Sequence, residues 1–348
     1  MNDQLTILAP DDFHVHFRDN DMLPETVAAT ARCFRRAIAM PNLVPPVTTA
    51  EMATAYRERI VAEIPQSRQL QPLMTIYLTD RTTPEMIRVA KSAGVVAAKL
   101  YPAGATTNSD SGVTALEKIF PALEEMSERR MLLLVHGEVT QAEIDIFDRE
   151  KVFVATQLAQ IVKRYPDLKV VAEHITTTEA TQFVQSCGAN VAATITPQHL
   201  LLNRNDLLVG GVQPHNYCLP ILKRKTHQQA LREVATSGSP KFFLGSDSAP
   251  HEQVKKENAC GCAGCYSAWS ALELYAQFFD EADALDKLEG FACRHGADFY
   301  QLPHNRETVT LIRESWTVPE QIILPNGRPI IPFFAGKQIN WKLRPSRN

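Results

Sequence analysis

The 348-residue sequence has no run of 18 apolar residues that could span a bilayer, and its first residues lack the basic flank and apolar core of a signal peptide. It has no block of like charge, and its formal net charge is only -3, so nothing indicates a nucleic-acid partner. With 45% hydrophobic residues, the chain has enough apolar mass for a large core. We expect a cytoplasmic globular protein that binds neither membranes nor nucleic acids.

Cysteine is scarce, with seven residues in the chain. This number is too small for a disulfide framework at this length, and because it is odd, at least one thiol is unpaired. A reducing compartment fits this usage. Three of the thiols lie in C-G-C-A-G-C, from Cys260 to Cys265, which suggests a structural zinc site but is one ligand short of the usual four.

Eight short runs rich in Val, Ile, Leu and Ala alternate with longer stretches that have helical spacing. The runs predict strands at Phe13–His16, Ala37–Pro41, Leu73–Thr79, Ala97–Tyr101, Leu132–Gly137, Val170–His174, Val191–Thr196 and Phe242–Asp247. The longer stretches predict helices at Glu25–Arg35, Ala50–Glu63, Pro84–Ala93, Thr114–Arg129, Gln141–Arg164 with an interruption, Thr178–Cys187, His227–Thr236, Tyr266–Phe279 and Ala282–His295.

This alternation favours an α/β fold with a parallel sheet, and eight such units suit a closed (β/α)8 TIM barrel. A doubly wound open sheet is the structural alternative. No G-x-G-x-x-G follows the first strand, so nothing supports a dinucleotide-binding fold. We find no linker, and we predict one domain over residues 1–348, with a Pro-rich C-terminal portion that ends in Phe333–Lys342.

Two loops depart from the regular spacing. Gln198–Lys225 is long and contains Gly and Pro breakers, which suits an elaborated loop over an active site. Ala103–Gly112 is small and polar, and it could act as a mobile lid. An ordinary solvated turn is an equally good interpretation of its composition.

The stretch D-F-H-V-H-F-R-D, from Asp12 to Asp19, carries the first chemical signal. His14 and His16 are two residues apart, so a strand places both imidazoles on one face, where they could hold one metal ion. A catalytic metal usually needs a third protein ligand and an open position. The rest of the chain must therefore supply further ligands.

The carboxyl ends of the predicted strands supply them, because active sites of barrels are built at that end. Polar residues at these ends are His14, His16, Asn42, Lys99, His136, His174 and Asp247. Taken singly, a histidine here is more often a structural hydrogen-bonding residue, Lys99 a lysine that reaches water, and Asp247 a cap of a turn. Four histidines, a lysine and an aspartate at the same end of five strands together predict a metal site.

Lys99 is unusual in such a set, because an ammonium group repels a cation. Burial beside metal ions lowers the pKa of an amine, and a neutral amine can react with carbon dioxide. The resulting carbamate is anionic and has two oxygens, one for each of two ions. It would supply the bridge that the set otherwise lacks.

An ordered series of segments carries a family resemblance over nearly the whole chain. The segments are H-V-H-F-R-D, M-P-N-L-V-P-P-V-T-T, A-A-K-L-Y-P-A-G-A-T-T-N, L-L-V-H-G-E-V-T, E-H-I-T-T, T-I-T-P-Q-H-L, Y-C-L-P-I-L-K and G-S-D-S-A-P-H. Together they resemble the compact bacterial dihydroorotases of the amidohydrolase superfamily. H-x-H alone is only moderately specific, whereas this series is very specific.

The resemblance implies a centre of two Zn²⁺ ions per chain. Its ligands would be His14, His16, Lys99 (as N6-carboxylysine), His136, His174 and Asp247. His14, His16 and Asp247 would hold the more buried ion, His136 and His174 the more exposed one, and Lys99 would bridge them. Residues that match substrate-binding positions are Arg18, Asn42, Thr106, Thr107, Leu219, His251 and Ala263. Thr106 and Thr107 match the lid.

The implied activity is the reversible cyclisation of N-carbamoyl-L-aspartate to L-dihydroorotate in pyrimidine synthesis, through a metal-bridging hydroxide with Asp247 as general acid and base. The family also implies a homodimer. Ser246 and Gly104 depart from the threonine and asparagine expected there, which bears mainly on lid mobility. The resemblance includes the turn around Ala263, so we favour a cysteine loop without metal. The alternatives are a hydantoinase or dihydropyrimidinase and a non-catalytic amidohydrolase-like scaffold.

Overall fold

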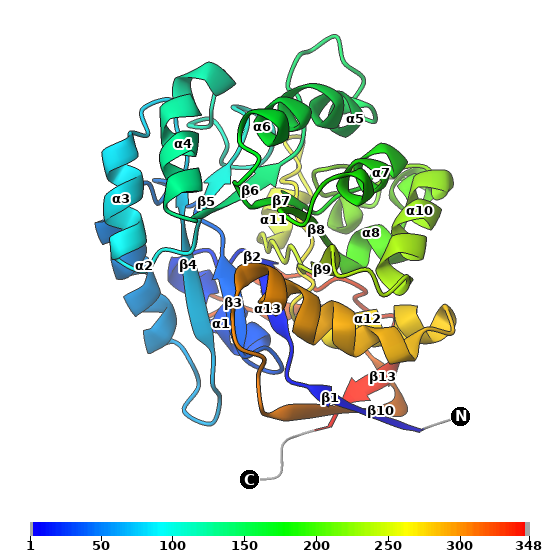
Figure 1. Cartoon of the computed structure of the whole chain (residues 1–348). Coiled ribbons are helices and arrows are strands. Elements are labelled where there is room, and N and C mark those ends of the chain that lie inside the picture. Colours follow the sequence, from blue (N-terminus) through cyan, green and yellow to red (C-terminus); the bar gives the residue numbers. More distant parts are fainter. Residues whose placement is uncertain (1–2, 345–348) are drawn as a thin grey trace.

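Eight parallel strands form the centre of the molecule, in a computed structural model that describes residues 3–344 (Figure 1). Their order in the sheet is the order of the sequence: β2 (Asp11–Val15), β3 (Arg36–Ala39), β4 (Gln71–Tyr77), β5 (Ala97–Leu100), β6 (Leu132–His136), β7 (Val170–Glu173), β8 (Val191–Ile195) and β9 (Phe242–Leu244). Beyond β9, Ser248 bridges Val15 in parallel, and the amide of Asp247 donates to O of His14 at 2.8 Å. The sheet therefore closes into a barrel, which confirms the predicted (β/α)8 fold.

Helices cover the outside of the barrel (Figure 1). The α-helices are α1 (Leu23–Thr30), α2 (Ala50–Ala62), α3 (Pro84–Ser92), α4 (Phe120–Glu128), α5 (Arg149–Phe153), α6 (Ala159–Arg164), α7 (Thr178–Ser186), α8 (Pro197–Leu201), α9 (Arg204–Leu208), α10 (Lys225–Thr236), α11 (Gln253–Lys256), α12 (Ala271–Glu281) and α13 (His295–Tyr300). Shorter 3₁₀ and π turns are η1 (Asn20–Met22), η2 (Leu116–Ile119), η3 (Val154–Leu158), η4 (Pro214–Asn216), η5 (Leu285–Lys287) and η6 (Gly290–Arg294).

Threonines at strand-to-helix junctions fix where several helices begin. The side chains of Thr49, Thr83, Thr177 and Thr196 each accept a hydrogen bond from a backbone amide in the first turn of the following helix. Such caps satisfy amides that have no partner within the helix. Two of these helices also have proline at their first position, where no amide hydrogen is needed.

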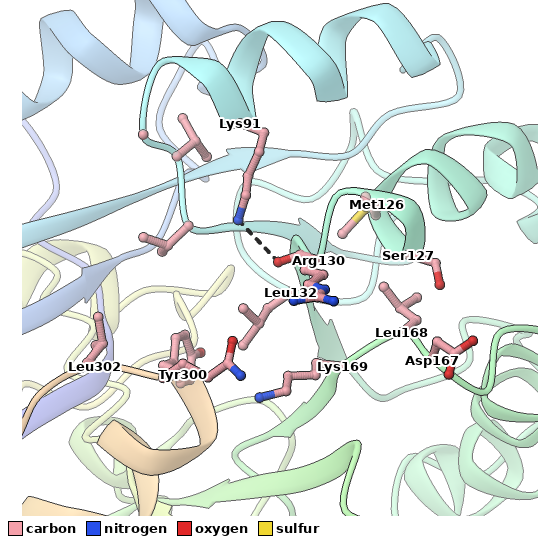
Figure 2. Close-up of a pocket in the computed structure, with 14 residues that line it drawn as sticks. Lys91, Met126, Ser127, Arg130, Leu132, Asp167, Leu168, Lys169, Tyr300 and Leu302 are labelled. Carbon is pink, nitrogen blue, oxygen red and sulfur yellow. Dashed lines mark hydrogen bonds between the residues drawn. The ribbon is translucent and has the colours of Figure 1, made fainter.

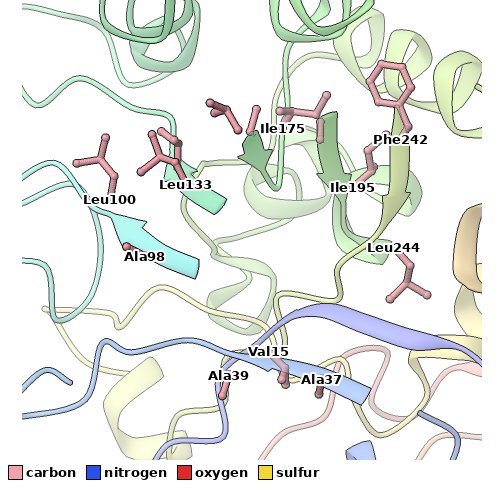
Figure 3. Packing of buried hydrophobic residues seen from close by; sticks show 14 of the residues in the cluster. Val15, Ala37, Ala39, Ala98, Leu100, Leu133, Ile175, Ile195, Phe242 and Leu244 are labelled. Carbon is pink, nitrogen blue, oxygen red and sulfur yellow. The ribbon is translucent and has the colours of Figure 1, made fainter. Parts of the chain in front are cut away.

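Two apolar layers hold the barrel together. The interior cluster includes Phe13, Leu134 and Phe243, together with Phe299 and Tyr300 at the end of α13. The outer cluster lies between the strands and the helices, and Figure 3 shows members of it, such as Leu100, Leu133 and Phe242. Successive strand residues alternate between the two layers, as the period of a strand requires.

Some helix predictions were wrong in their bounds. The helix predicted at Gln141–Arg164 begins only at Arg149, and the π segment η3 provides its expected interruption. The predicted loop Gln198–Lys225 contains α8, α9 and η4. The helix predicted from Tyr266 begins at Ala271, because Tyr266 instead bridges Pro332.

The terminal regions form sheets that were not predicted. β1 (Gln4–Leu8), β10 (Thr308–Thr317) and β13 (Gln338–Leu343) make a three-stranded antiparallel sheet, and β13 packs against α12 (Figure 1). β11 (Ile322–Ile323) and β12 (Pro329–Ile330) form a short hairpin. The helical region predicted at Ala282–His295 divides into η5, η6 and the start of α13.

Candidate active site

Strand alternation directs the side chains that gather at the carboxyl end of the barrel. In β5, Ala97 belongs to the interior cluster and Ala98 to the outer one, so Lys99 faces the interior. In β6, Leu134 belongs to the interior cluster and Val135 to the outer one, so the following residue, His136, faces the interior. Two strands thus deliver a lysine and a histidine to one space.

An irregularity in β2 lets both His14 and His16 reach the site. The register with β3 shifts between Asp12 and Val15. Phe13 packs in the interior cluster and Val15 in the outer cluster, while His14 and His16 both reach the site. A β-bulge re-aims side chains in this way, and such bulges are common next to active sites.

Two further residues of the site, His174 and Asp247, have a strained backbone conformation. His174 has a φ of 41° and Asp247 a φ of 44°, both in the left-handed region that residues other than glycine rarely adopt. The amide of His174 donates to Oγ1 of Thr194 at 2.7 Å, which helps to hold this conformation. The turn at His174 lets consecutive residues, Glu173 and His174, both approach the site, because a regular strand would separate them. Strain of this kind is found at functional sites.

His14, His16 and Asp247 form a buried triangle of potential metal ligands. Oδ1 of Asp247 lies 3.1 Å from Nε2 of His16 and 3.3 Å from Nε2 of His14, and the two Nε2 atoms are 3.4 Å apart. Ligands about 2.0–2.1 Å from one tetrahedral ion are separated by about 3.3 Å. These three atoms therefore have the spacing that a single bound cation requires.

Acceptor side chains orient the imidazoles. Nδ1 of His14 lies 2.7 Å from Oε2 of Glu173, and Nδ1 of His16 lies 2.7 Å from Oδ1 of Asn42. Both rings therefore turn Nε2 toward the triangle. Histidines that ligate metals usually donate their other nitrogen to such an acceptor, which fixes the tautomer.

His136 is oriented through its other ring nitrogen, Nε2, and not through Nδ1. Its Nε2 lies 2.7 Å from Oε2 of the buried Glu138, which leaves Nδ1 available. The ring centroids of His136 and His174 are 4.8 Å apart, and those of His174 and His14 are 5.0 Å apart. Nδ1 of His174 is buried without a hydrogen-bond partner among residues 3–344. The structure thus brings the four predicted histidines together.

Lys99 lies in the same buried space. It is 0% exposed, and its Nζ has no hydrogen-bond partner within the described part of the chain. Its Nζ lies 5.1 Å from the centre of the Tyr101 ring. Burial lowers the pKa of Lys99 to about 8, although Glu173 and Asp247 act in the opposite direction. An appreciable fraction of this amine is therefore neutral near pH 7, as reaction with carbon dioxide requires.

The charge states of the neighbouring side chains suit metal binding. Burial lowers the pKa of His16 to about 3 and that of His174 well below its usual value, so both rings are neutral. Burial opposes the charge on Asp247, but a hydrogen bond and positive charge from His14, together with a hydrogen bond from His16, hold its pKa well below the usual range. Neutral imidazoles and an ionised carboxylate are the forms that ligate cations.

A group of polar residues lies beside the ligands. Nε of Arg18 donates to O of Pro250 at 3.2 Å, and its Nη2 lies 3.1 Å from Nε2 of His251. His251 also lies 3.0 Å from O of Ala263. Nη1 of Arg18 is buried and has no hydrogen-bond partner among the described residues. This guanidinium can therefore receive an anionic group.

Thr107, one of the two predicted lid residues, contacts this group. Nδ2 of Asn42 donates to O of Thr107 at 3.2 Å, and Oγ1 of Thr107 donates to O of Ala263 at 3.3 Å. The enclosed cavity has a volume of about 20 Å³, which is room for about one water molecule. Residues lining it are His16, Arg18, Asn42, Tyr101, Thr106, Thr107, His136, His174, Leu219, Asp247, Ala249, Ala263 and Gly264. All seven predicted substrate-binding residues thus line this cavity or contact a residue that does.

Some residues of the site were missed from the sequence. Glu173 and Glu138 contact the predicted ligands His14 and His136, and the buried Asp12 accepts hydrogen bonds from the amides of His14 and Ser246. The hydroxyl of Ser246 also donates to Asp12, so the serine keeps the contact that a threonine hydroxyl could make. The one available signal was position, because both glutamates lie within two residues of a predicted histidine ligand.

The cysteine loop does not assemble a metal site. Cys260 is exposed, Cys262 is partly buried and Cys265 is buried, and all seven thiols are free. Within residues 3–344, His14, His16 and Asp247 are the one group of at least three His, Cys, Asp or Glu ligands close enough to share an ion. The same part of the chain contains no helix of the length and apolarity needed to cross a bilayer.

Comparison with known proteins identifies the family of this chain. The model of the amidohydrolase family matches residues 10–337. A dihydroorotase from a Marinomonas species is 69% identical over 98% of this chain and 99% of its own length. The structure of dihydroorotase from Saccharomyces cerevisiae in complex with 5-fluoroorotic acid is 32% identical, with a TM-score of 0.91, and covers 99% of both chains.

More distant structures share the fold. L-hydantoinase (dihydropyrimidinase) from Arthrobacter aurescens has a TM-score of 0.81 at 16% identity and covers 98% of this chain and 83% of its own. At that identity the likeness concerns the barrel and not the substrate. The chain belongs to the amidohydrolase family and, within it, to the dihydroorotases.

Proposed function

We propose that this chain catalyses the reversible cyclisation of N-carbamoyl-L-aspartate to L-dihydroorotate, a step of pyrimidine synthesis. One observation carries the assignment of an acidic substrate. The buried Nη1 of Arg18, without a partner among residues 3–344, lines a cavity shared with Asp247, His136 and His174. A cationic group beside potential metal ligands suits a cyclic amide that carries a carboxylate.

We propose that two divalent ions, zinc in the first instance, bind at this site. His14, His16 and Asp247 would hold one ion, His136 and His174 the other, and carboxylated Lys99 would bridge them. The spacing of the triangle and the unpartnered amine of Lys99 support this arrangement. When bound, such ions polarise a carbonyl group and make hydroxide available at neutral pH.

Asp247 is suited to move the proton. Its low pKa keeps the carboxylate ionised at neutral pH, so it can accept a proton during hydrolysis and return it to the departing ring nitrogen. The close imidazoles of His14 and His16 hold its Oδ1 in place. In the direction of ring closure, Asp247 takes the proton from the carbamoyl nitrogen.

Arg18, Asn42 and His251 would bind the substrate carboxylate. The guanidinium of Arg18 is fixed by Pro250 and His251, so its remaining donors keep one direction. A preformed fork of donors matches a carboxylate better than a single flexible ammonium does. Leu219 and Ala263 line the same cavity and would contact the substrate largely through their backbones.

The lid would exclude water during the reaction. In the observed conformation Thr106 and Thr107 leave room for about one water molecule, so a substrate must displace them to enter. Thr107 and Asn42 would then exchange their mutual contacts for contacts with the substrate. Lid closure of this kind sequesters the reaction and completes the site.

The decisive assay compares L-dihydroorotate with hydantoin and dihydrouracil, which lack the carboxylate. The proposal predicts ring opening of dihydroorotate and little turnover of the other two. Equal turnover of hydantoin would favour a hydantoinase or dihydropyrimidinase. Absence of any hydrolysis after zinc and bicarbonate are supplied would favour a non-catalytic scaffold.

We also propose that the enzyme is a cytoplasmic homodimer. The resemblance to bacterial dihydroorotases supports this proposal. Sedimentation at several protein concentrations tests the dimer, and cell fractionation tests the location.

A further inference from the structure

A second cavity lies at the opposite end of the barrel from the active site. It has a volume of about 640 Å³, within the usual range for small-molecule sites. Its residues lie at or just before the amino ends of β5, β6 and β7, in α3 and α4, or at the end of α13 and just after it (Figure 2). Residues lining it are Lys91, Gly94, Val95, Val96, Met126, Ser127, Arg130, Leu132, Asp167, Leu168, Lys169, Tyr300, Gln301 and Leu302.

Three cationic side chains from different parts of the chain line this cavity. Lys91 belongs to α3, whereas Arg130 and Lys169 precede β6 and β7 (Figure 2). Nζ of Lys91 donates to O of Arg130 at 3.1 Å, and Nζ of Lys169 donates to O of Phe299 at 2.7 Å. These hydrogen bonds fix both ammonium groups at the cavity.

No carboxylate neutralises these charges. Among residues 3–344, none of Lys91, Arg130 and Lys169 has an acidic group within 4.0 Å of its charged nitrogens. Asp167 is the one acidic residue lining the cavity, and it forms no such ion pair in the described part of the chain. Burial alone lowers the pKa values of both lysines, with no compensating carboxylate. The cavity therefore has an unbalanced positive charge.

The remaining wall is largely apolar. Leu132 and Leu168 are buried, and Val95 and Met126 lie in the outer core cluster. Val96 and Leu302 complete this wall, and the cavity is much larger than the volume of an inorganic anion. A ligand that fills the cavity needs an anionic end and an uncharged body of appreciable size.

We propose that this cavity binds a phosphorylated small molecule of nucleotide size, with its phosphate on Lys91, Arg130 and Lys169 and its uncharged body against the apolar wall. Phosphate accepts several charge-assisted hydrogen bonds at once, so it suits a cavity lined by three cations. The inference does not depend on the metal centre, because every residue involved lies at the other end of the barrel.

Calorimetric titration of the purified, metal-loaded enzyme tests the proposal with uridine 5′-monophosphate, adenosine 5′-monophosphate, uridine and inorganic phosphate. We expect at least one nucleotide to bind with a Kd below about 1 mM. Uridine and inorganic phosphate should bind at least about tenfold more weakly, because uridine lacks the phosphate and inorganic phosphate lacks the uncharged body. Failure of both nucleotides to bind, or equally tight binding of inorganic phosphate, would overturn the proposal.

The double variant Lys91→Gln/Lys169→Gln tests the location. Glutamine keeps a donor for each backbone carbonyl but removes the charge, so nucleotide binding should weaken at least about tenfold for each lysine. The matched control, Lys225→Gln/Lys337→Gln, removes the same charge from exposed positions outside the cavity and should bind as the parent does. Unchanged binding in the cavity variant would place the ligand elsewhere. Dihydroorotate hydrolysis, measured alongside, should be unchanged in both variants and shows that each is folded.

Discussion

Oε2 of Glu173 lies 2.7 Å from Nδ1 of His14 and accepts a hydrogen bond from Oγ1 of Thr194 at 2.6 Å. The carboxylate thus fixes the His14 tautomer that presents Nε2 to Asp247. Glu173→Gln places an amide beside this ring and weakens the acceptor. We predict a 10–100-fold loss of affinity for the first metal ion. Competition with a chromogenic chelator measures it, with the exposed Glu124→Gln as control. Equal affinity in the Glu173 variant would remove this orienting role.

Lys99 contributes to the pH dependence of the stability of the metal-free protein. Its folded pKa of about 8 lies below its ordinary value, so the unfolded chain binds more protons between these two values and stability rises with pH there. Below about pH 8, burial of the ammonium destabilises the fold by on the order of 3 kcal/mol.

We therefore predict that Lys99→Met raises the free energy of unfolding of metal-free protein near pH 7, and that the difference fades toward pH 10.5. Urea unfolding across this range, in chelator and without carbon dioxide, measures it. Lys163→Met, at an exposed position, should show no such pH dependence. A Lys99 variant that is less stable at pH 7 would contradict the assigned pKa.

The strands and the clustering of the candidate ligands could be predicted, because both follow from short local sequence patterns. Each barrel strand is a short apolar run, and each candidate ligand follows or ends such a run. Since all parallel strands point the same way, their carboxyl ends meet at one mouth. His14, Lys99 and Asp247 could therefore be placed together from strand ends alone.

Other features depend on contacts that no local pattern records. β1 pairs with β10 about three hundred residues away, so its sequence gives no hint of a partner. The alternation of strand residues predicts that Glu173 faces the barrel interior. Its neighbour His174 faces the same space only because its backbone has a positive φ, which the sequence pattern does not indicate. The start of α12 at Ala271 reflects the tertiary bridge between Tyr266 and Pro332.

Arg18 should determine affinity for the substrate carboxylate. Its Nε is held by Pro250 and its Nη2 by His251, and lysine cannot reproduce three nitrogens in one plane. We predict that Arg18→Lys raises KM for dihydroorotate at least about tenfold, with a smaller change in kcat. Steady-state kinetics measures both, and the exposed Arg57→Lys should behave as the parent. An unchanged KM would exclude Arg18 from carboxylate binding.

Thr107 should control closure of the lid. Thr107→Val keeps the shape of the side chain but removes the hydroxyl that donates to Ala263. A net hydrogen bond contributes about 1 kcal/mol, so we predict a several-fold rise in KM with no change in metal content. Kinetics and metal analysis on the same preparation check both parts. Loss of metal would instead indicate that the lid supports the ligands.

The most direct test of the whole account measures bound metal and dihydroorotate hydrolysis together, in the parent enzyme and in Lys99→Ala. The parent should contain two ions per chain and be active, and the variant should lose both metal and activity. Short-chain carboxylic acids should restore part of the activity, because their two oxygens can replace those of the lysine carbamate. Full activity and two ions in Lys99→Ala without added acid would contradict the account.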